Sequence, residues 1–255
     1  MVPSPSVLVL PVAAAIAAGL VGSFAVMRRM ALASDAMSHV ALPGIGIALL
    51  LHVNPVLGGV VALVSGAVVI WLLQHRTRIP TEAIVGVVFS AALAVGSMLT
   101  SGEELLEALF GSAQAPGRTE TLISVGLAGV IVGFVLRARH RLLLSLVSAD
   151  LARTAGVKVA RLDLSYLLAF ALTVALGLRY LGILLMGSLI IIPAATARHV
   201  TRSLDTMLVA AAGLAVAATV IGTLWARALD LPGGPLIITV AAGFFALGVV
   251  FRRAG

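Results

Sequence analysis

Long apolar runs separated by short polar stretches repeat along the whole chain. A helix needs about 20 apolar residues to cross the hydrocarbon core of a bilayer. The runs approach this length and lack the ten-residue alternation of transmembrane β-strands. The pattern predicts an all-α, polytopic transmembrane helical bundle of about nine spans, or eight if one segment is re-entrant or merged. The expected spans are 6–27, 31–51, 55–73, 80–100, 119–136, 162–181, 183–198, 206–226 and 234–251.

The basic residues set the expected orientation of this bundle. They fall in short clusters between the apolar runs, which is typical of cytoplasmic loops rather than of a nucleic-acid surface, despite a net charge of +7. With nine spans, every cluster lies on one side if the N-terminus is outside and the C-terminus is cytoplasmic. Arg118, Arg179 and Arg227 are exceptions that fall outside. The clusters are Arg28-Arg29, His75 to Arg78, Arg137 to Arg141, Lys158 to Arg161, Arg198 to Arg202, and Arg252-Arg253.

The composition argues against a soluble domain of ordinary size. The chain is 61% hydrophobic and 11% charged, whereas soluble domains are about a quarter charged. Residues 1–255 are therefore expected to form a single transmembrane domain. The sequence has no cysteine, which excludes thiolate metal ligands. It also has no phosphate-binding G-x-x-x-x-G-K-[ST] loop, so active transport would need a second, ATP-hydrolysing subunit or an ion gradient.

Two short segments between the expected spans are predicted to be helices outside the membrane. Residues 101–112, on the expected outer side, carry Glu103 and Glu104 in the first turn, where the helix dipole favours negative charge. Residues 148–157, on the expected cytoplasmic side, begin at Ser148 as a plausible N-cap and stop at Gly156. The second helix is either an ordinary loop element or a docking helix for a cytoplasmic partner.

One acid stands apart from the others. Asp35 lies inside an apolar run, where a carboxylate costs about 2.5–3.5 kcal/mol; the remaining acids lie in loops or at span ends. His39 follows it by four residues, so both side chains share a helix face. Pro43 lacks an N–H and would free the carbonyl of residue 39, and Gly44 permits a bend or a close helix contact.

These features allow three readings of the Asp35–His39 pair. It can be a polar pathway for a metal, and nitrogen and oxygen ligands without sulfur suit Zn²⁺ or Mn²⁺ better than Cu⁺. It can be a proton relay. It can also be a structural hydrogen-bonded pair beside a kink, because D-x-x-x-H is a pattern of low specificity.

Several longer motifs resemble one family of membrane proteins. The stretch "GSFAVMRRMALASDAMSHVALPGIGIALLLHVNP" looks like the opening of the ABC-type zinc/manganese permeases, the ZnuB-like membrane subunits of metal importers. Further similar segments follow in the same order along the chain. They are "GVVFSAALAVGSML", "LFG", "SADLARTAGV", "GILLMGSLIIIPAATARH" and "DLPGGPLII".

The resemblance implies a permease domain in the bacterial cytoplasmic (inner) membrane that forms a homodimer with a second copy of itself. Its expected partners are two cytoplasmic ATP-binding subunits, an extracytoplasmic metal-binding protein and membrane lipids, with no nucleic acid. The chain itself would be a transport subunit and not an enzyme, with ATP hydrolysed in the separate partner. No cofactor would be bound permanently.

The resemblance also assigns roles to residues. Asp35 and His39 match the metal-pathway motif of the family. Asp150, Ala152 and Gly156 match its cytoplasmic segment that packs against the ATPase. The same short helix suggests that Leu151 and Arg153 also take part in this ATPase coupling. Pro193, in "IIPAATA", is assigned with Pro43 and Gly44 to helix kinks and close packing rather than to metal ligation.

Zinc is the expected cargo, carried by alternating access. The segments "LLMGSLIIIPAATARH" and "LPGGP" look more like zinc members than manganese members, although Ser90 stands near a position where some zinc members carry histidine. A manganese or iron importer of the same family is the alternative. A proton-coupled secondary metal transporter, with Asp35 and His39 as the relay, is a further one.

Overall fold

The computed structural model describes residues 5–99 and 117–253, and throughout these ranges the regular structure is helical. The helix predicted at 101–112 lies outside the described residues. The helices are α1 (Pro5–Met27), α2 (Ala31–His39), α3 (Ala41–Leu50), α4 (Pro55–Arg76), α5 (Thr81–Leu99), α7 (Arg118–Val147), α8 (Ala149–Thr154), α9 (Val159–Val200), α10 (Leu204–Leu229) and α11 (Gly233–Arg253). The predicted all-α class is confirmed.

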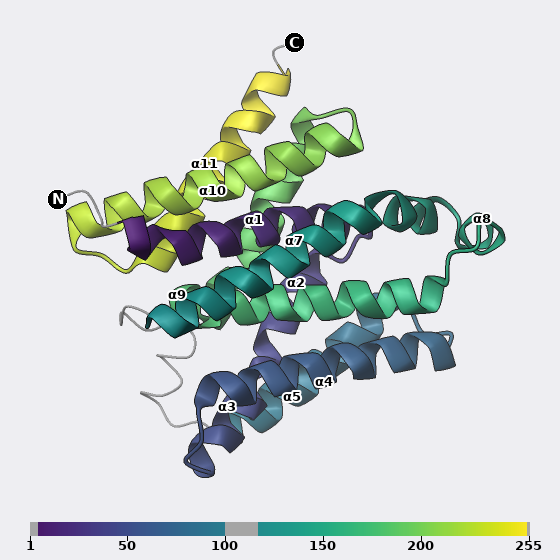
Figure 1. Ribbon diagram of the computed structural model, residues 1–255, viewed down its shortest axis with the longest axis horizontal. Coiled ribbons are helices and arrows are strands. Elements are labelled where there is room, and N and C mark those ends of the chain that lie inside the picture. Colours follow the sequence, from purple (N-terminus) through teal and green to yellow (C-terminus); the bar gives the residue numbers. More distant parts are fainter. Residues whose placement is uncertain (1–4, 100–116, 254–255) are drawn as a thin grey trace.

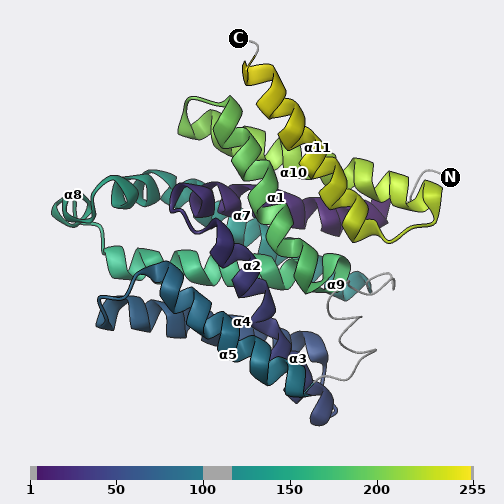
Figure 2. The same cartoon turned by 180° about the vertical axis from the view of Figure 1, so that it is seen from behind.

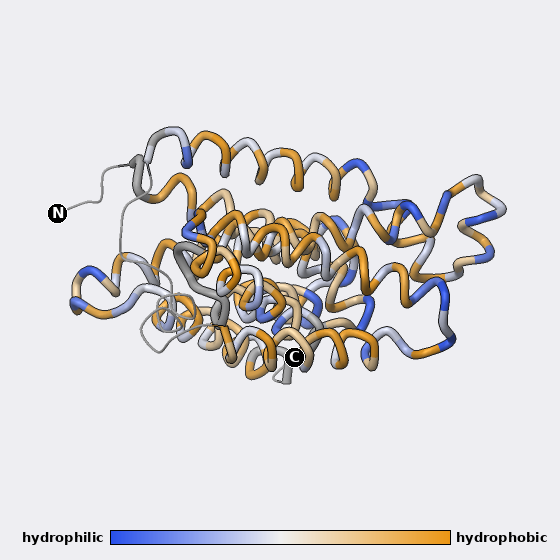
Figure 3. Tube along the Cα trace, turned by 90° about the horizontal axis from the view of Figure 1, so that it is seen from below, coloured by the Kyte–Doolittle hydropathy of each residue, from blue (hydrophilic) through white to orange (hydrophobic). Residues whose placement is uncertain are grey.

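Seven of the described helices contain segments long and apolar enough to cross a membrane. The hydropathy-coloured trace shows hydrophobic residues along the long helices and hydrophilic ones gathered at the turns, including the end that carries α8 (Figure 3). The count of nine spans and the side on which each terminus lies stay predictions. The segments are Leu8–Met27, Pro55–Arg76, Thr81–Leu99, Thr119–Val147, Val159–Leu178, Leu204–Leu229 and Gly233–Val250.

Helix α1 lies at the centre of the bundle, packed against α7, α9 and α10 (Figure 1). Its small residues allow this close approach. Gly19 lies against the backbone of Ala211 in α10, and Gly22 lies against the carbonyl of Ile190 in α9. Helices α3, α4 and α5 form a second group, which α2 and α9 join to the rest.

Helix α9 is bent rather than straight. A straight helix of its 42 residues would be about 63 Å long, twice the hydrocarbon thickness of a bilayer. Gly177 nevertheless lies against the side chain of Met186, although nine residues would separate them by about 13.5 Å along a straight axis. The second part of α9 therefore turns away and crosses the bundle (Figure 2). The spans expected at 162–181 and 183–198 belong to this one bent element.

The single span expected at 31–51 differs from the structure, which has two short helices. Helix α2 ends at His39 and α3 begins at Ala41, with Val40 between them. Pro43 is the third residue of α3, where a backbone N–H would have no partner within the helix. The break therefore comes one turn before the proline, and it places the carboxyl end of α2 inside the bundle.

Candidate functional site

The buried face of α2 is fixed against the second part of α9. Ser34, Met37 and Ser38 are buried on this face. The Ser34 hydroxyl donates a long hydrogen bond of 3.4 Å to the carbonyl of Gly187, and the Ser38 hydroxyl donates to the Ser34 carbonyl at 3.0 Å. A Cβ atom on Gly187 would lie 2.9 Å from the Cα of Asp35. The two backbones touch, so α9 sets the position of α2.

The side chains of Asp35 and His39 lie four residues apart on α2, so they share one face of the helix. Asp35 is exposed and His39 is half-buried on the surface of a single chain. The His39 ring packs against Phe89 of α5, with the ring centroids 5.4 Å apart. Its Nδ1 atom is buried and has no hydrogen-bond partner. The imidazole is therefore held in place by packing and not by a hydrogen bond at this nitrogen.

The ligands that one chain can offer a metal are few. Across residues 5–99 and 117–253, no three of the histidine, aspartate and glutamate side chains come together as a metal-binding group. A closed zinc site takes four ligands and a catalytic one takes three plus water. Asp35 and His39 therefore supply two ligands at most, which describes an incomplete and weak site rather than a structural one.

The short helix α8 presents one side to solvent. Ser148 caps it by accepting a hydrogen bond from the backbone N–H of Leu151 at 3.2 Å, and Gly156 follows it with φ +78°. Asp150 and Arg153 are exposed and form an ion pair at 2.7 Å. Ala152 is fully buried, while Leu151 is 57% exposed. Ala152 thus anchors α8, while Asp150, Leu151 and Arg153 face outward.

The residues assigned to kinks and packing lie at helix contacts. Gly44 of α3 lies against the backbone of Gly58 in α4. Pro193 lies within α9 and is buried, and the neighbouring Ala194 and Ala197 form a small core with α10.

Sequence reasoning did not identify the residues that hold the pair in place. Phe89 and Gly187 come from helices distant in sequence, and neither belongs to a motif that indicates a binding site. Gly187 stands between Met186 and Ser188 within an apolar helix, and a small residue in such a helix indicates close helix packing in general.

The chain is similar in sequence to a known family of membrane proteins. Residues 5–252 match the model of the family described as the ABC 3 transport family. The chain is 31% identical to the manganese transport system membrane protein MntC of Halalkalibacterium halodurans, with 91% of this chain and 82% of the relative covered. It is 31% identical to the high-affinity zinc uptake system membrane protein ZnuB of Haemophilus influenzae, with 91% and 90% covered.

A solved structure has the same fold. The structure of PsaBC from Streptococcus pneumoniae in complex with a Fab matches with a TM-score of 0.82 at 27% identity. The match covers 95% of this chain and 89% of the other. The similarity therefore extends over almost the whole described bundle.

Proposed function

The chain belongs to the ABC 3 transport family, and from this membership and the geometry of α2 we propose that it imports divalent metal, with zinc as the preferred ion. It is an ABC transporter permease, a transport subunit embedded in a bacterial inner membrane. The import would proceed by alternating access, driven by ATP hydrolysis in separate subunits.

The Asp35–His39 pair carries this proposal. It joins a carboxylate and an imidazole on one face of a helix within an apolar segment, and such groups in membrane segments mark ion pathways by default. Two ligands make a weak site, and a site that conducts an ion must release it. A second copy of the chain, facing the exposed Asp35 side chain, would enclose the pathway between two permeases.

The exposed side of α8 supports docking of an ATP-binding subunit. Leu151 offers an apolar contact flanked by the Asp150–Arg153 ion pair, while buried Ala152 ties the helix to the bundle. An extracytoplasmic metal-binding protein would deliver the ion on the opposite side.

Zinc is preferred on motif similarity, with manganese or iron as the alternatives within the same family. Nitrogen and oxygen ligands accept all of these ions, and the relatives named above are called manganese and zinc systems. Ser90, next to the Phe89 that packs on His39, is the residue whose identity counts most against zinc.

The test uses the permease assembled with its ATP-binding subunits and with the binding protein loaded in turn with Zn²⁺ and Mn²⁺. We expect stronger ATPase stimulation with Zn²⁺ and loss of metal import in His39→Ala. His140→Ala is the matched control, because His140 is an exposed histidine on α7. Normal import by assembled His39→Ala would refute the pathway, and import that continues without ATP would favour the proton-coupled transporter.

A further inference from the structure

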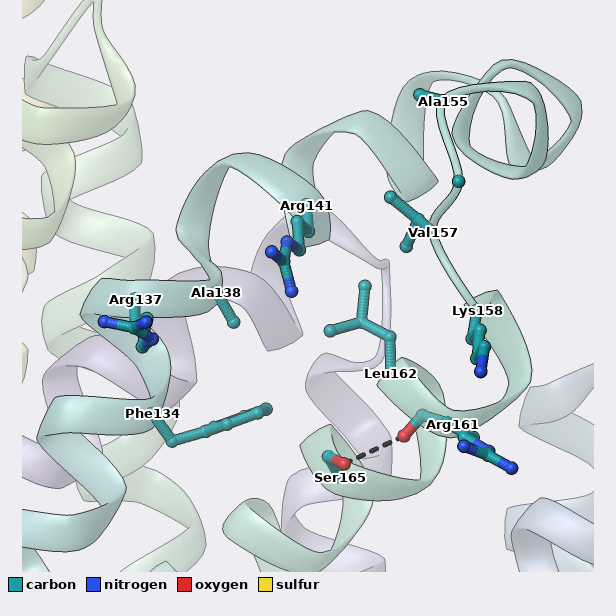
Figure 4. A pocket seen from close by; sticks show the side chains of 11 residues that line it. Phe134, Arg137, Ala138, Arg141, Ala155, Val157, Lys158, Arg161, Leu162 and Ser165 are labelled. Carbon is teal, nitrogen blue, oxygen red and sulfur yellow. Dashed lines mark hydrogen bonds between the residues drawn. The ribbon is translucent and has the colours of Figure 1, made fainter.

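A cavity of about 460 Å³ lies between α7 and the first turns of α9, next to α8 (Figure 4). Four cations line it, two from each long helix: Arg137 and Arg141 from α7, and Lys158 and Arg161 at the start of α9. No aspartate or glutamate is among the lining residues. The cavity is therefore strongly positive, and it is separate from the Asp35–His39 pair.

The nearby acids do not neutralise these cations. Asp150 pairs with Arg153 at 2.7 Å, Asp163 with Arg28 at 2.9 Å, and Asp205 with Arg139 at 3.3 Å. Within the described ranges, no ion pair joins any of the four lining cations to a carboxylate. Four like charges around one cavity repel one another, so an anion bound among them would be stabilised.

The cavity also has an apolar part. Phe134 and Leu162 project into the space between the helices, and the guanidinium of Arg141 is directed into it, while the charged ends of Lys158 and Arg161 lie at the opposite rim (Figure 4). Residues on the outer face of α7 are apolar and exposed, such as Val130 at 69%. The cavity therefore lies where a membrane-facing helix surface meets a basic cluster.

We propose that this cavity binds the phosphate of an anionic phospholipid headgroup. Basic pockets between transmembrane helices on the cytoplasmic side bind such headgroups, and arginine can hold a phosphate through two parallel hydrogen bonds. The apolar residues favour a lipid over free phosphate, since they would contact the glycerol and upper acyl carbons. The headgroup would bind in the cavity between α7 and α9, next to α8, and would leave the exposed surface of α8 uncovered.

The test measures lipid binding by the full chain, purified in detergent and stripped of lipid, without metal or nucleotide. Phosphatidylglycerol, phosphatidylcholine and inorganic phosphate are added separately, and binding is followed by native mass spectrometry and thermal stabilisation. Each cation near an anionic group contributes roughly a fivefold factor in affinity. The double variant Arg137→Gln/Arg141→Gln removes two such cations and should therefore bind phosphatidylglycerol about 25-fold more weakly. Arg137→Lys/Arg141→Lys, which keeps the charge, should retain most of the binding.

The control is Arg76→Gln/Arg78→Gln, which removes two exposed arginines, one at the end of α4 and one in the turn after it, neither of which lines the cavity. It should bind phosphatidylglycerol as the unmodified chain does. Equal binding by the cavity variant and this control would overturn the proposal. So would equal binding of phosphatidylcholine, which points to apolar contact alone. If inorganic phosphate stabilises the chain as much as phosphatidylglycerol does, the cavity is a site for free phosphate and not for a lipid. If the cavity variant keeps its lipid but fails to bind the ATP-binding subunit, the cations serve that partner.

Discussion

Replacing Gly187 with alanine should displace the helix that carries the candidate site. The new Cβ would lie 2.9 Å from the Asp35 Cα and 3.2 Å from the Ser34 carbonyl oxygen. Carbon atoms in contact are normally 3.5–4.0 Å apart, so α2 must move by about 0.6 Å or more. The obstructing atoms belong to the backbone, and no side-chain rotation can relieve the clash. Inserting a methyl group into such a packed contact costs about 1–3 kcal/mol.

The matched control is Gly213→Ala in α10, where a Cβ atom would meet nothing within 4 Å. Both substitutions remove a helical glycine and so gain the same 0.5–1 kcal/mol or so of helix stability. The difference in stability between the two variants therefore reports the cost of the clash alone. Thermal unfolding in detergent measures this difference, and each kcal/mol lowers the unfolding temperature by about 2–4 °C in a chain of this size. Metal uptake by the assembled transporter measures the effect on the site.

We expect Gly187→Ala to unfold at a lower temperature than Gly213→Ala and to import metal more slowly, because Asp35 and His39 move with α2. If the two variants unfold at the same temperature, the α2–α9 contact is looser than the structure shows. If Gly187→Ala is less stable but imports metal normally, the position of α2 does not determine transport, and the site assignment fails.

Three further changes test other parts of the molecule. Leu151→Asp should leave the unfolding temperature unchanged, because this side chain is 57% exposed, and should abolish ATP-driven uptake; pull-down of the ATP-binding subunit checks it. Gly156→Ala should destabilise the end of α8 by about 1–2 kcal/mol, because φ is +78° there, and hydrogen exchange at α8 should rise. Asp163→Asn should cost about 1–3 kcal/mol, because it leaves the largely buried Arg28 without its carboxylate 2.9 Å away, while Asp163→Glu should cost less; thermal unfolding measures both.

The parts of the fold that were predictable from sequence are those that local physics controls. Apolar runs give helices because a backbone in hydrocarbon must satisfy its own hydrogen bonds. The boundaries of α8 follow from Ser148 as a cap and Gly156 as a left-handed stop, both of which act within one turn. Asp35 stood out because the cost of a carboxylate in an apolar segment depends on the segment and not on the rest of the fold.

The parts that were not predictable depend on contacts between distant residues. Arg28 looked like one member of a basic cluster, and Asp163 like an acid at a span end. The structure pairs them across 135 positions and places the Arg28 guanidinium 4.6 Å from the Tyr166 ring. The bend of α9 is set in the same way, by packing between its two parts. Hydropathy measures the preference of a segment for the membrane and says nothing about which helix it faces.

The break at Val40 depends both on local sequence and on contacts with residues distant in the chain. The proline explains why a helix ends near His39, but only the packing decides which face of α2 is covered. Ser34 and Ser38 take the covered face against α9, which leaves Asp35 exposed on the same helix. An exposed carboxylate in an apolar segment is unfavourable against lipid and favourable against water or a second polar surface. The two-ligand set of a single chain and the exposed Asp35 are both accounted for by the proposed function, in which a second surface facing α2 completes the metal pathway.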